Sequence, residues 1–181
     1  MSSDSNKLAR FERLVLPHLD AAHNLARWLL RNPADAEDVV QEACLRAFSF
    51  FHSFQGENGR PWLLTIVRNS CYTFLQKNKR LDTVTEFDEQ LHSPETETVA
   101  DPETWIVQQP GREAIHKALE ELPLEYREVI TLRELEGLSY REIAEVTGAP
   151  LGTVMSRLAR ARKRLEQSLA TLVKKEASGG M

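Results

Sequence analysis

The sequence predicts an all-α fold of two small helical domains joined by a flexible acidic linker. Apolar residues recur at helical spacing through the first 80 residues and again after residue 112. Between these stretches, residues 81–111 contain eight acidic residues and three prolines but no lysine or arginine. Long alternation of apolar and polar residues is absent from the sequence, so no β-sheet is expected.

The N-terminal domain, residues 8–80, is expected to contain four helices. Pro17 separates the first two, because proline has no N–H group to donate to the helical ladder. Asn32 and Pro33 end the second helix, and Asp35 is expected to be the N-cap of the third. The buried faces of these three helices carry Phe11, Leu14, Val15, Ala22, Leu25, Ala26, Leu29, Val39, Val40, Ala43, Ala47 and Phe51.

A loop over residues 53–60 precedes the fourth helix and contains Gly56 and Gly59. Pro61 suits the first turn of this helix, whose apolar periodicity continues to about Lys79. The linker, residues 81–111, follows. The C-terminal domain, residues 112–173, is expected to contain four more helices, with approximate bounds 114–122, 123–135, 140–146 and 153–173.

Residues 138–165 have the pattern of a helix-turn-helix motif. Ser139 and Glu142 have the spacing of a capping box, and Gly148 suits the tight turn between two helices. The expected buried stripe of the second helix consists of Val154, Leu158, Ala161 and Leu165. The residues expected to face outward are Thr153, Ser156, Arg157, Arg160 and Arg164.

This outward face has the chemistry of a DNA-reading helix. An α-helix fits the major groove of B-DNA, where arginine can read guanine and hydroxyl groups can bond to base edges or phosphates. The net charge of the chain is −4, but residues 139–166 carry six basic and three acidic residues. The alternative is a helical hairpin with a solvated basic face. The capping box, the glycine turn and the arginine-rich face together favour DNA binding.

Composition disfavours several other classes of function. No apolar run approaches the roughly 20 residues that span a bilayer, and the polar N-terminus lacks a signal-peptide core, so we expect a cytoplasmic protein without membrane insertion. The five histidines are scattered, and no metal-ligand, nucleophilic or phosphate-binding motif occurs, so no metal, cofactor or enzymatic activity is expected. Cys44 and Cys71 lie in amphipathic segments, which favours buried structural roles over a redox role.

Two blocks of the sequence resemble the extracytoplasmic-function (ECF) sigma factors of the sigma-70 family. Residues 35–42 are similar to region 2.2 of that family, and residues 61–69 to regions 2.3 and 2.4. The residues that are similar to region 4 are Leu122-Pro123, Arg127-Glu128-Val129, 136–144 and 152–162. The resemblance implies a region 2 helical bundle, a region 4 helix-turn-helix, and an alternative sigma factor that binds core RNA polymerase and directs promoter-specific initiation.

The resemblance also implies three sets of site residues. Those expected to bind core polymerase are Asp35, Asp38, Gln41 and Glu42, for which a solvated helix N-terminus is the alternative. Those expected to bind the −10 element are Arg60, Trp62, Arg68, Asn69, Tyr72, Lys77, Lys79 and Arg80, although core packing is favoured over base stacking for Trp62. Those expected to bind the −35 element are Thr153, Met155, Ser156, Arg157, Arg160 and Arg164.

Four positions depart from the family pattern. Thr73, Gln76 and Gln55 stand where relatives commonly have charged residues, so the −10 preference is not expected to follow that of relatives. Met155 stands where arginine or lysine is common, so its base contact would be apolar, for example to a thymine methyl group.

The expected partners are core RNA polymerase, promoter DNA and an anti-sigma factor, all implied by the resemblance. A free-standing helix-turn-helix regulator is the alternative function. It explains the C-terminal domain but gives no role to the block from residue 35 to residue 80. The two hypotheses make different predictions. A free-standing regulator would bind promoter DNA tightly on its own, whereas a sigma factor would bind it well only with core polymerase.

Overall fold

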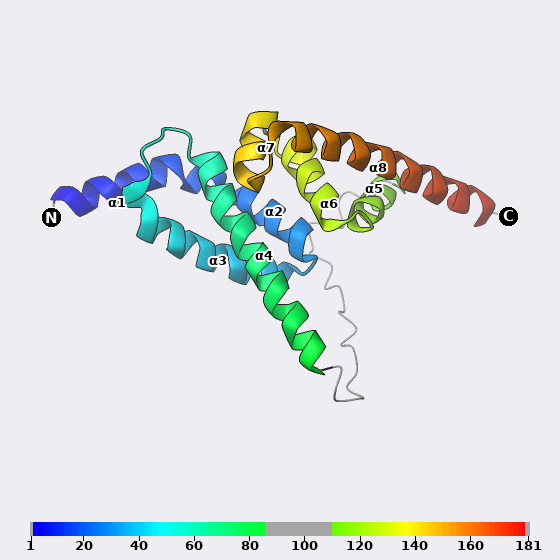
Figure 1. Ribbon diagram of the computed structural model, residues 1–181, viewed down its shortest axis with the longest axis horizontal. Coiled ribbons are helices and arrows are strands. Elements are labelled where there is room, and N and C mark those ends of the chain that lie inside the picture. The colour runs from blue at the N-terminus through cyan, green and yellow to red at the C-terminus, as the bar shows by residue number, and fades with distance from the viewer. Residues whose placement is uncertain (1, 86–109, 180–181) are drawn as a thin grey trace.

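All regular structure that the computed structural model describes is helical, in residues 2–85 and 110–179 (Figure 1). The predicted all-α fold is therefore confirmed for these residues. We refer to residues 2–85 as the N-terminal half and to residues 110–179 as the C-terminal half. The expected linker falls outside the described residues from residue 86 to residue 109.

The N-terminal half contains four α-helices and two short 3-10 turns. They are α1 (Ser2–Leu14), η1 (Leu16–His18), α2 (Leu19–Leu30), α3 (Pro33–Phe50), η2 (Phe51–Ser53) and α4 (Gly59–Thr85). Helix α4 continues past the expected end at Lys79 and includes the first residues of the expected linker.

The prediction that Asp35 caps α3 is wrong. Asn32 is the N-cap, because its backbone is extended and its side-chain oxygen accepts a hydrogen bond from the Asp35 N–H group at 3.1 Å. Pro33 occupies the first helical position, where a missing N–H group costs nothing. The helix therefore starts earlier than expected, and Asp35 lies within its first turn.

Gly59 lets α4 begin against the end of α1. A Cβ atom at this position would lie 2.0 Å from the backbone oxygen of Leu14, so no larger residue fits without moving the backbone. This close approach fixes where the loop before α4 joins the helical bundle.

The C-terminal half contains five helical elements. They are α5 (Pro110–Glu120), α6 (Leu124–Ile130), η4 (Thr131–Leu135), α7 (Tyr140–Thr147) and α8 (Leu151–Gly179). The segment expected as one helix ending at Leu135 divides into the α-helix α6 and the π-helical turn η4. In this wider turn the Glu136 N–H group donates to the oxygen of Thr131 at 3.0 Å.

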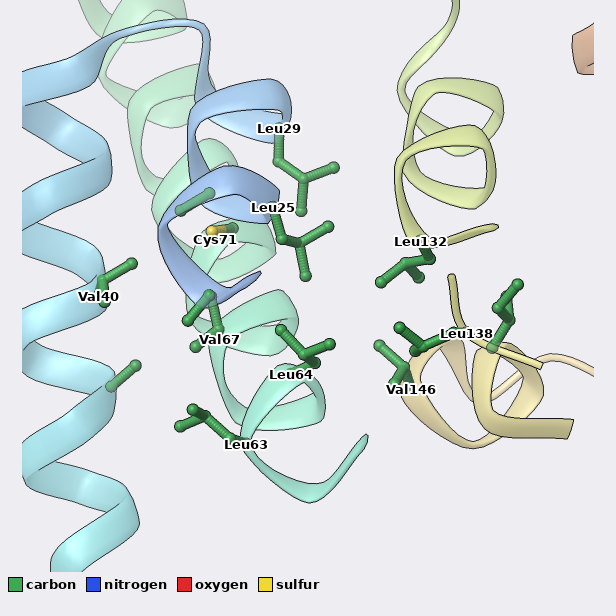
Figure 2. Packing of buried hydrophobic residues seen from close by; sticks show 14 of the residues in the cluster. Leu25, Leu29, Val40, Leu63, Leu64, Val67, Cys71, Leu132, Leu138 and Val146 are labelled. Carbon is green, nitrogen blue, oxygen red and sulfur yellow. The ribbon is translucent and has the colours of Figure 1, made fainter. Parts of the chain in front are cut away.

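The two halves share one continuous hydrophobic core. Leu25 and Leu29 of α2 and Leu64 of α4 face apolar residues of the C-terminal half, and all are fully buried (Figure 2). Those residues are Leu132, Leu138 and Val146. Burial of apolar surface therefore stabilises the contact between the halves as well as each half.

The halves meet on one side of the N-terminal bundle. Helices α2 and α4 contact the C-terminal half, chiefly through α6 and α7, whereas α3 packs against α2 and α4 on the side away from it (Figure 1). Helix α8 packs on α5, α6 and α7, and its last turns extend beyond them. The outward surfaces of α3 and α8 therefore lie far apart.

Candidate nucleic-acid interface

Helices α7 and α8 form the expected helix-turn-helix. The Ser139 hydroxyl accepts a hydrogen bond from the Glu142 N–H group, and the Glu142 carboxylate accepts one from the Ser139 N–H group, both at 3.1 Å. Gly148 has a φ of 68° in the turn, a conformation that favours glycine. Val154 and Leu158 are buried on the inner side of α8, as expected.

The outer face of α8 is accessible. Met155 is 51% exposed, and Ser156, Arg160 and Arg164 are exposed as well. Thr153 and Arg157 are half-buried; the guanidinium group of Arg157 lies 3.8 Å from the carboxylate of Glu125 on α6. All six residues expected to bind the −35 element thus lie on α8, and four of them are exposed.

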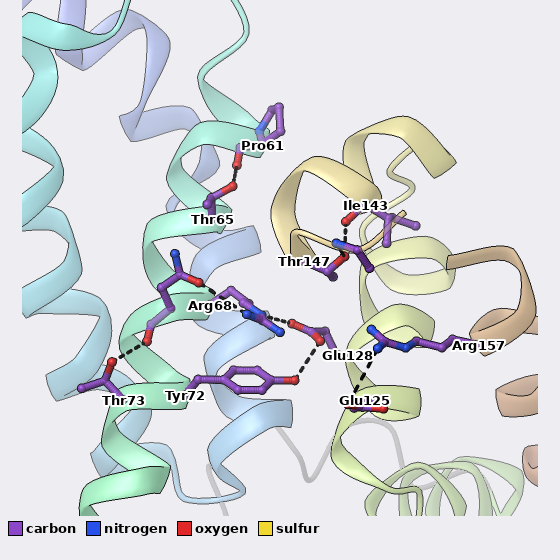
Figure 3. Close-up of polar contacts among 12 residues, drawn as sticks. Pro61, Thr65, Arg68, Tyr72, Thr73, Glu125, Glu128, Ile143, Thr147 and Arg157 are labelled. Carbon is purple, nitrogen blue, oxygen red and sulfur yellow. Dashed lines mark hydrogen bonds and ion pairs between the residues drawn. The ribbon is translucent and has the colours of Figure 1, made fainter. Parts of the chain in front are cut away.

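The candidate −10 residues lie along α4, and three of them already contact acidic residues of the C-terminal half. Arg68 Nε lies 2.6 Å from Glu128 Oε1, and the Tyr72 hydroxyl donates to Glu128 Oε2 at 2.8 Å (Figure 3). Arg60 lies nearer the start of α4 and is 3.4 Å from the carboxylate of Glu142. The sequence had not indicated this pairing between the two halves.

Glu128 is the centre of this contact and is fully buried. The Arg68 guanidinium also lies over the Tyr72 ring, with its carbon 3.8 Å from the ring centre. Burial alone would lower the pKa of Arg68, but the hydrogen bond to Glu128 and its charge outweigh burial and raise that pKa. Burial, together with the charge of Glu128, raises the pKa of Tyr72. At neutral pH the Glu128 carboxylate therefore contacts two groups, the charged guanidinium of Arg68 and the neutral phenol of Tyr72.

Arg127, which precedes Glu128, forms a second connection between the halves. It is 2% exposed, and its guanidinium donates to the backbone oxygens of Trp28 and Leu29 at the end of α2. It also donates to the backbone oxygens of Glu120, the last residue of α5, and of Leu122, which follows α5. Burial, followed by the nearby charge of Arg31, lowers the pKa of Arg127 to about 10, so the group stays charged at neutral pH.

Arg60 and its neighbours make further contacts across the halves. The Arg60 guanidinium donates to the backbone oxygen of Glu136 at 3.2 Å, and the Asn24 amide donates to the Glu136 carboxylate at 3.0 Å. Burial alone would raise the pKa of Glu142, but the hydrogen bonds from Ser139 and the charge of Arg60 outweigh burial and lower it. Glu142 therefore acts both as a helix cap and as a partner of the other half.

The other candidate −10 residues are placed differently. Trp62 is half-buried, and its ring centre lies 4.9 Å from that of Phe54 and 5.9 Å from that of Phe51, in keeping with the expected core packing. Further along α4, exposed side chains are presented by Asn69, Lys77, Lys79 and Arg80. Lys77 lines a small pocket together with Val39, Glu42 and Arg46 of α3, whereas the last turns of α4 extend beyond the bundle (Figure 1).

The residues expected to bind polymerase lie on α3. Asp38, Gln41 and Glu42 are exposed, and Asp35 is half-buried in the first turn. Glu42 forms an ion pair with Arg46 at 3.3 Å, one helical turn further along. Leu45, four residues after Gln41, is 69% exposed on the same side and was not singled out from the sequence. Its helical spacing from Asp38 and Gln41 was the signal that could have identified it.

Cys71 is buried and Cys44 is half-buried. Burial raises the pKa of Cys44, and burial together with Glu128 raises the pKa of Cys71 to about 12, so both thiols are unreactive at neutral pH. No group of three or more potential metal ligands occurs among the described residues. None of the helices in residues 2–85 and 110–179 is both long and apolar enough to cross a membrane.

Comparisons with known proteins match two parts of the chain to known families. Residues 14–81 match the family described as Sigma-70 region 2, and residues 112–165 match Sigma-70, region 4. The chain is 34% identical over 147 residues to the ECF RNA polymerase sigma-E factor of Escherichia coli (strain K12), covering 78% of this chain and 77% of that protein. It is also 34% identical over 158 residues to the ECF RNA polymerase sigma-E factor of Haemophilus influenzae, covering 82% and 81%.

A solved structure shares the fold as well. It is the sigma factor RpoE in complex with the anti-sigma factor NepR from Bartonella quintana, with a TM-score of 0.69 and 30% identity over 86% of this chain and 94% of that one. The two matched families, the relatives and this structure all lead to one assignment. The chain belongs to the ECF sigma factors of the sigma-70 family, alternative sigma factors that bind core RNA polymerase and direct transcription initiation at particular promoters.

Proposed function

We propose that three helices of this sigma factor, α3, α4 and α8, have different roles in promoter recognition. The outward face of α3, with Asp35, Asp38, Gln41, Glu42 and Leu45, binds core polymerase. Helix α4 binds the −10 element through Arg60, Trp62, Arg68, Asn69, Tyr72, Lys77, Lys79 and Arg80, and the outer face of α8 binds the −35 element as duplex DNA. The domain bounds that we propose are 8–80 for region 2, 81–111 for the linker and 112–173 for region 4.

The observation that carries this proposal is the chemistry of α4. Its basic residues already bind carboxylates, which resemble phosphates in charge and in their ability to accept paired hydrogen bonds from arginine. Opening duplex DNA forfeits about 1.4 kcal/mol of stacking per step, whereas stacking on an aromatic side chain contributes about 1–3 kcal/mol per base. A strand bound along α4 would gain both kinds of contact, from Arg68 and Tyr72 and from the basic end of the helix.

Partners and compartment follow from the same assignment. As a sigma factor, the chain supplies promoter recognition, and RNA synthesis belongs to the polymerase. We further propose that an anti-sigma factor holds the chain inactive in the cytoplasm. The solved relative from Bartonella quintana, which contains an anti-sigma factor, supports this proposal.

The proposal is tested by comparing variants of the two DNA surfaces in the holoenzyme. In fluorescence anisotropy, Lys77→Ala with Arg80→Ala should weaken binding to a single-stranded −10 oligonucleotide and leave binding to a duplex −35 fragment unchanged. Arg160→Ala should do the reverse, so that each variant is the control for the other. Both DNA fragments are taken from a promoter mapped with the wild-type holoenzyme.

Two results would contradict the proposal. If each variant lost the same affinity for the −10 oligonucleotide and for the −35 fragment, the two surfaces would not bind different promoter elements. Tight and specific promoter binding by the chain without core polymerase would favour a free-standing regulator instead. That alternative is not favoured, because residues 14–81 match sigma region 2.

A further inference from the structure

The loop over residues 54–58 leads directly into α4, the helix that we assign to the −10 element. The side chains of Gln55, Glu57 and Asn58 are exposed in this loop, and Arg60 lies in the first turn of α4. Amide and carboxylate groups can form hydrogen bonds with the edges of unpaired bases. The place of the loop relative to α4 therefore decides which bases these side chains can reach.

The 54–58 loop has little backbone hydrogen bonding of its own. Its residues take part in one backbone–backbone hydrogen bond outside the helices, from the Phe54 N–H group to the oxygen of Phe51 at 3.0 Å. The other end is held at the start of α4, where the Asn58 side-chain oxygen accepts a hydrogen bond from the Arg60 N–H group at 3.3 Å. The segment between these two points depends on another element for its order.

Arg10 of α1 supplies this order. One terminal nitrogen of its guanidinium donates to the backbone oxygen of Phe54 and the other to that of Gly56, both at 3.1 Å. Because the guanidinium is planar and rigid, the two bonds fix these carbonyl groups relative to each other and to α1. The exposed Gln55 lies between the two anchored residues.

Aromatic rings in turn hold the Arg10 guanidinium. Its central carbon lies 5.1 Å from the centre of the Phe51 ring and 5.7 Å from that of the Phe54 ring, and both rings belong to buried residues. The backbone of Gly56 is also close to the Phe54 ring, since a Cβ at this position would lie 3.1 Å from two ring carbons. Arg10, the two rings and Gly56 therefore pack as one unit that joins the loop to α1.

Arg10 precedes the part of the chain that matches Sigma-70 region 2, which begins at residue 14. Its hydrogen bonds reach 44 and 46 residues ahead, to Phe54 and Gly56. The family match therefore assigns no role to Arg10, and its contacts with the loop are evident only from the structure.

We propose that Arg10 is a positioning residue for −10 recognition, which holds the 54–58 loop so that Gln55 and Glu57 are presented to the bases bound next to α4. This inference rests on the proposed role of α4 in −10 binding. Arg10 acts through the loop and does not contact the DNA. Without its two hydrogen bonds the loop samples more conformations, so each contact with a preferred base must also order the loop, and discrimination among bases falls.

The test measures base preference in the holoenzyme. Promoters that differ only at single positions of the −10 element compete in one transcription reaction, so the amount of active polymerase cancels from the ratio of transcripts. Arg10→Ala removes both hydrogen bonds, whereas Arg10→Lys keeps the charge but places all donors on one nitrogen atom. The matched control is Arg13→Ala, which removes the same charge from an exposed position of the same helix. A loop variant, Gln55→Ala with Glu57→Ala, removes the side chains that the loop presents.

We expect Arg10→Ala to lower the preference at one or more −10 positions by at least about threefold, since two hydrogen bonds that order the loop are lost. Arg10→Lys should lower the preference at the same positions, and it replaces Arg10→Ala if that variant loses its helical circular dichroism. Adding Arg10→Ala to the loop variant should cause no further change, because Arg10 acts only through the loop side chains. Arg13→Ala should match wild type, and competition among promoters that differ in the −35 element should be the same for all variants.

Three results would overturn the positioning role. The first is that both Arg10 variants keep every −10 preference of wild type. The second is an equal change in Arg13→Ala or among the −35 promoters, which would show a general effect of charge or stability. The third is a further change when Arg10→Ala is added to the loop variant, which would show that Arg10 does not act through the loop. The proposed function would fail differently, because Lys77→Ala with Arg80→Ala would then leave −10 binding unchanged.

Discussion

Replacing Arg127 by lysine tests how strongly the buried guanidinium holds the molecule together. The side chain donates to four backbone oxygens in two places, those of Trp28 and Leu29 and those of Glu120 and Leu122. A lysine ammonium group has three donors on one nitrogen atom and cannot reach both places at once. At least two buried carbonyl groups would therefore lose their partner.

The expected loss follows from those two groups. Each buried acceptor without a partner costs about 1–3 kcal/mol, so Arg127→Lys should lower the free energy of unfolding by about 2–6 kcal/mol. The assay is urea unfolding followed by circular dichroism. The control is Arg133→Lys, since Arg133 donates to the single backbone oxygen of Leu138 at 2.8 Å. This control should lose about 1 kcal/mol. Equal losses in both variants, or a loss below about 0.5 kcal/mol for Arg127→Lys, would refute the reasoning.

Three further predictions concern separate parts of the chain. Gly59→Ala should lower the unfolding free energy by about 1–3 kcal/mol, because its Cβ would meet the oxygen of Leu14. Gly152→Ala, whose Cβ would meet nothing within 4 Å, should change the unfolding free energy little in the same urea unfolding assay. Met155→Arg should change the −35 preference in a promoter-library selection and preserve the fold, since the side chain is 51% exposed; unchanged specificity would count against a base contact there. Because the pKa of Glu142 is lowered on folding, its contribution to stability is fully present above its ordinary pKa of 4.5 and is lost as the pH falls through the folded value. Glu142→Gln should therefore show a smaller loss of stability between about pH 7 and pH 4 than wild type, and an identical loss would contradict this.

Local features of the fold could be predicted from the sequence with good accuracy. Apolar spacing located the helices, and the capping box at Ser139 with the glycine turn at Gly148 located the helix-turn-helix. The N-cap of α3 was predicted wrongly because two good N-cap residues lie three positions apart. Asp35 and Asn32 are both good N-cap residues, and the proline between them decides for Asn32. The spacing of apolar residues did not distinguish the π-helical turn η4 from the α-helix before it.

The contact between the halves could not be predicted from residue patterns. Arg127 and Glu128 appeared only as part of a family motif, because their partners lie about 60 to 100 residues earlier in the chain. Arginine and glutamate are ordinarily surface residues, so nothing in their own neighbourhood indicates burial. For the same reason the sequence could place Arg68 and Tyr72 on a DNA-binding helix but could not show that both side chains contact Glu128.

Reconstitution with core RNA polymerase tests the division of promoter recognition most directly. Purified chain and core are incubated with genomic DNA, and the 5′ ends of the transcripts are mapped. We predict that the chain joins the polymerase and that the starts share one element near −10 and another near −35. We also predict that Arg160→Ala reduces transcription from these starts. Transcripts that lack a shared upstream element, or that are unaffected by Arg160→Ala and by Lys77→Ala with Arg80→Ala, would contradict the account.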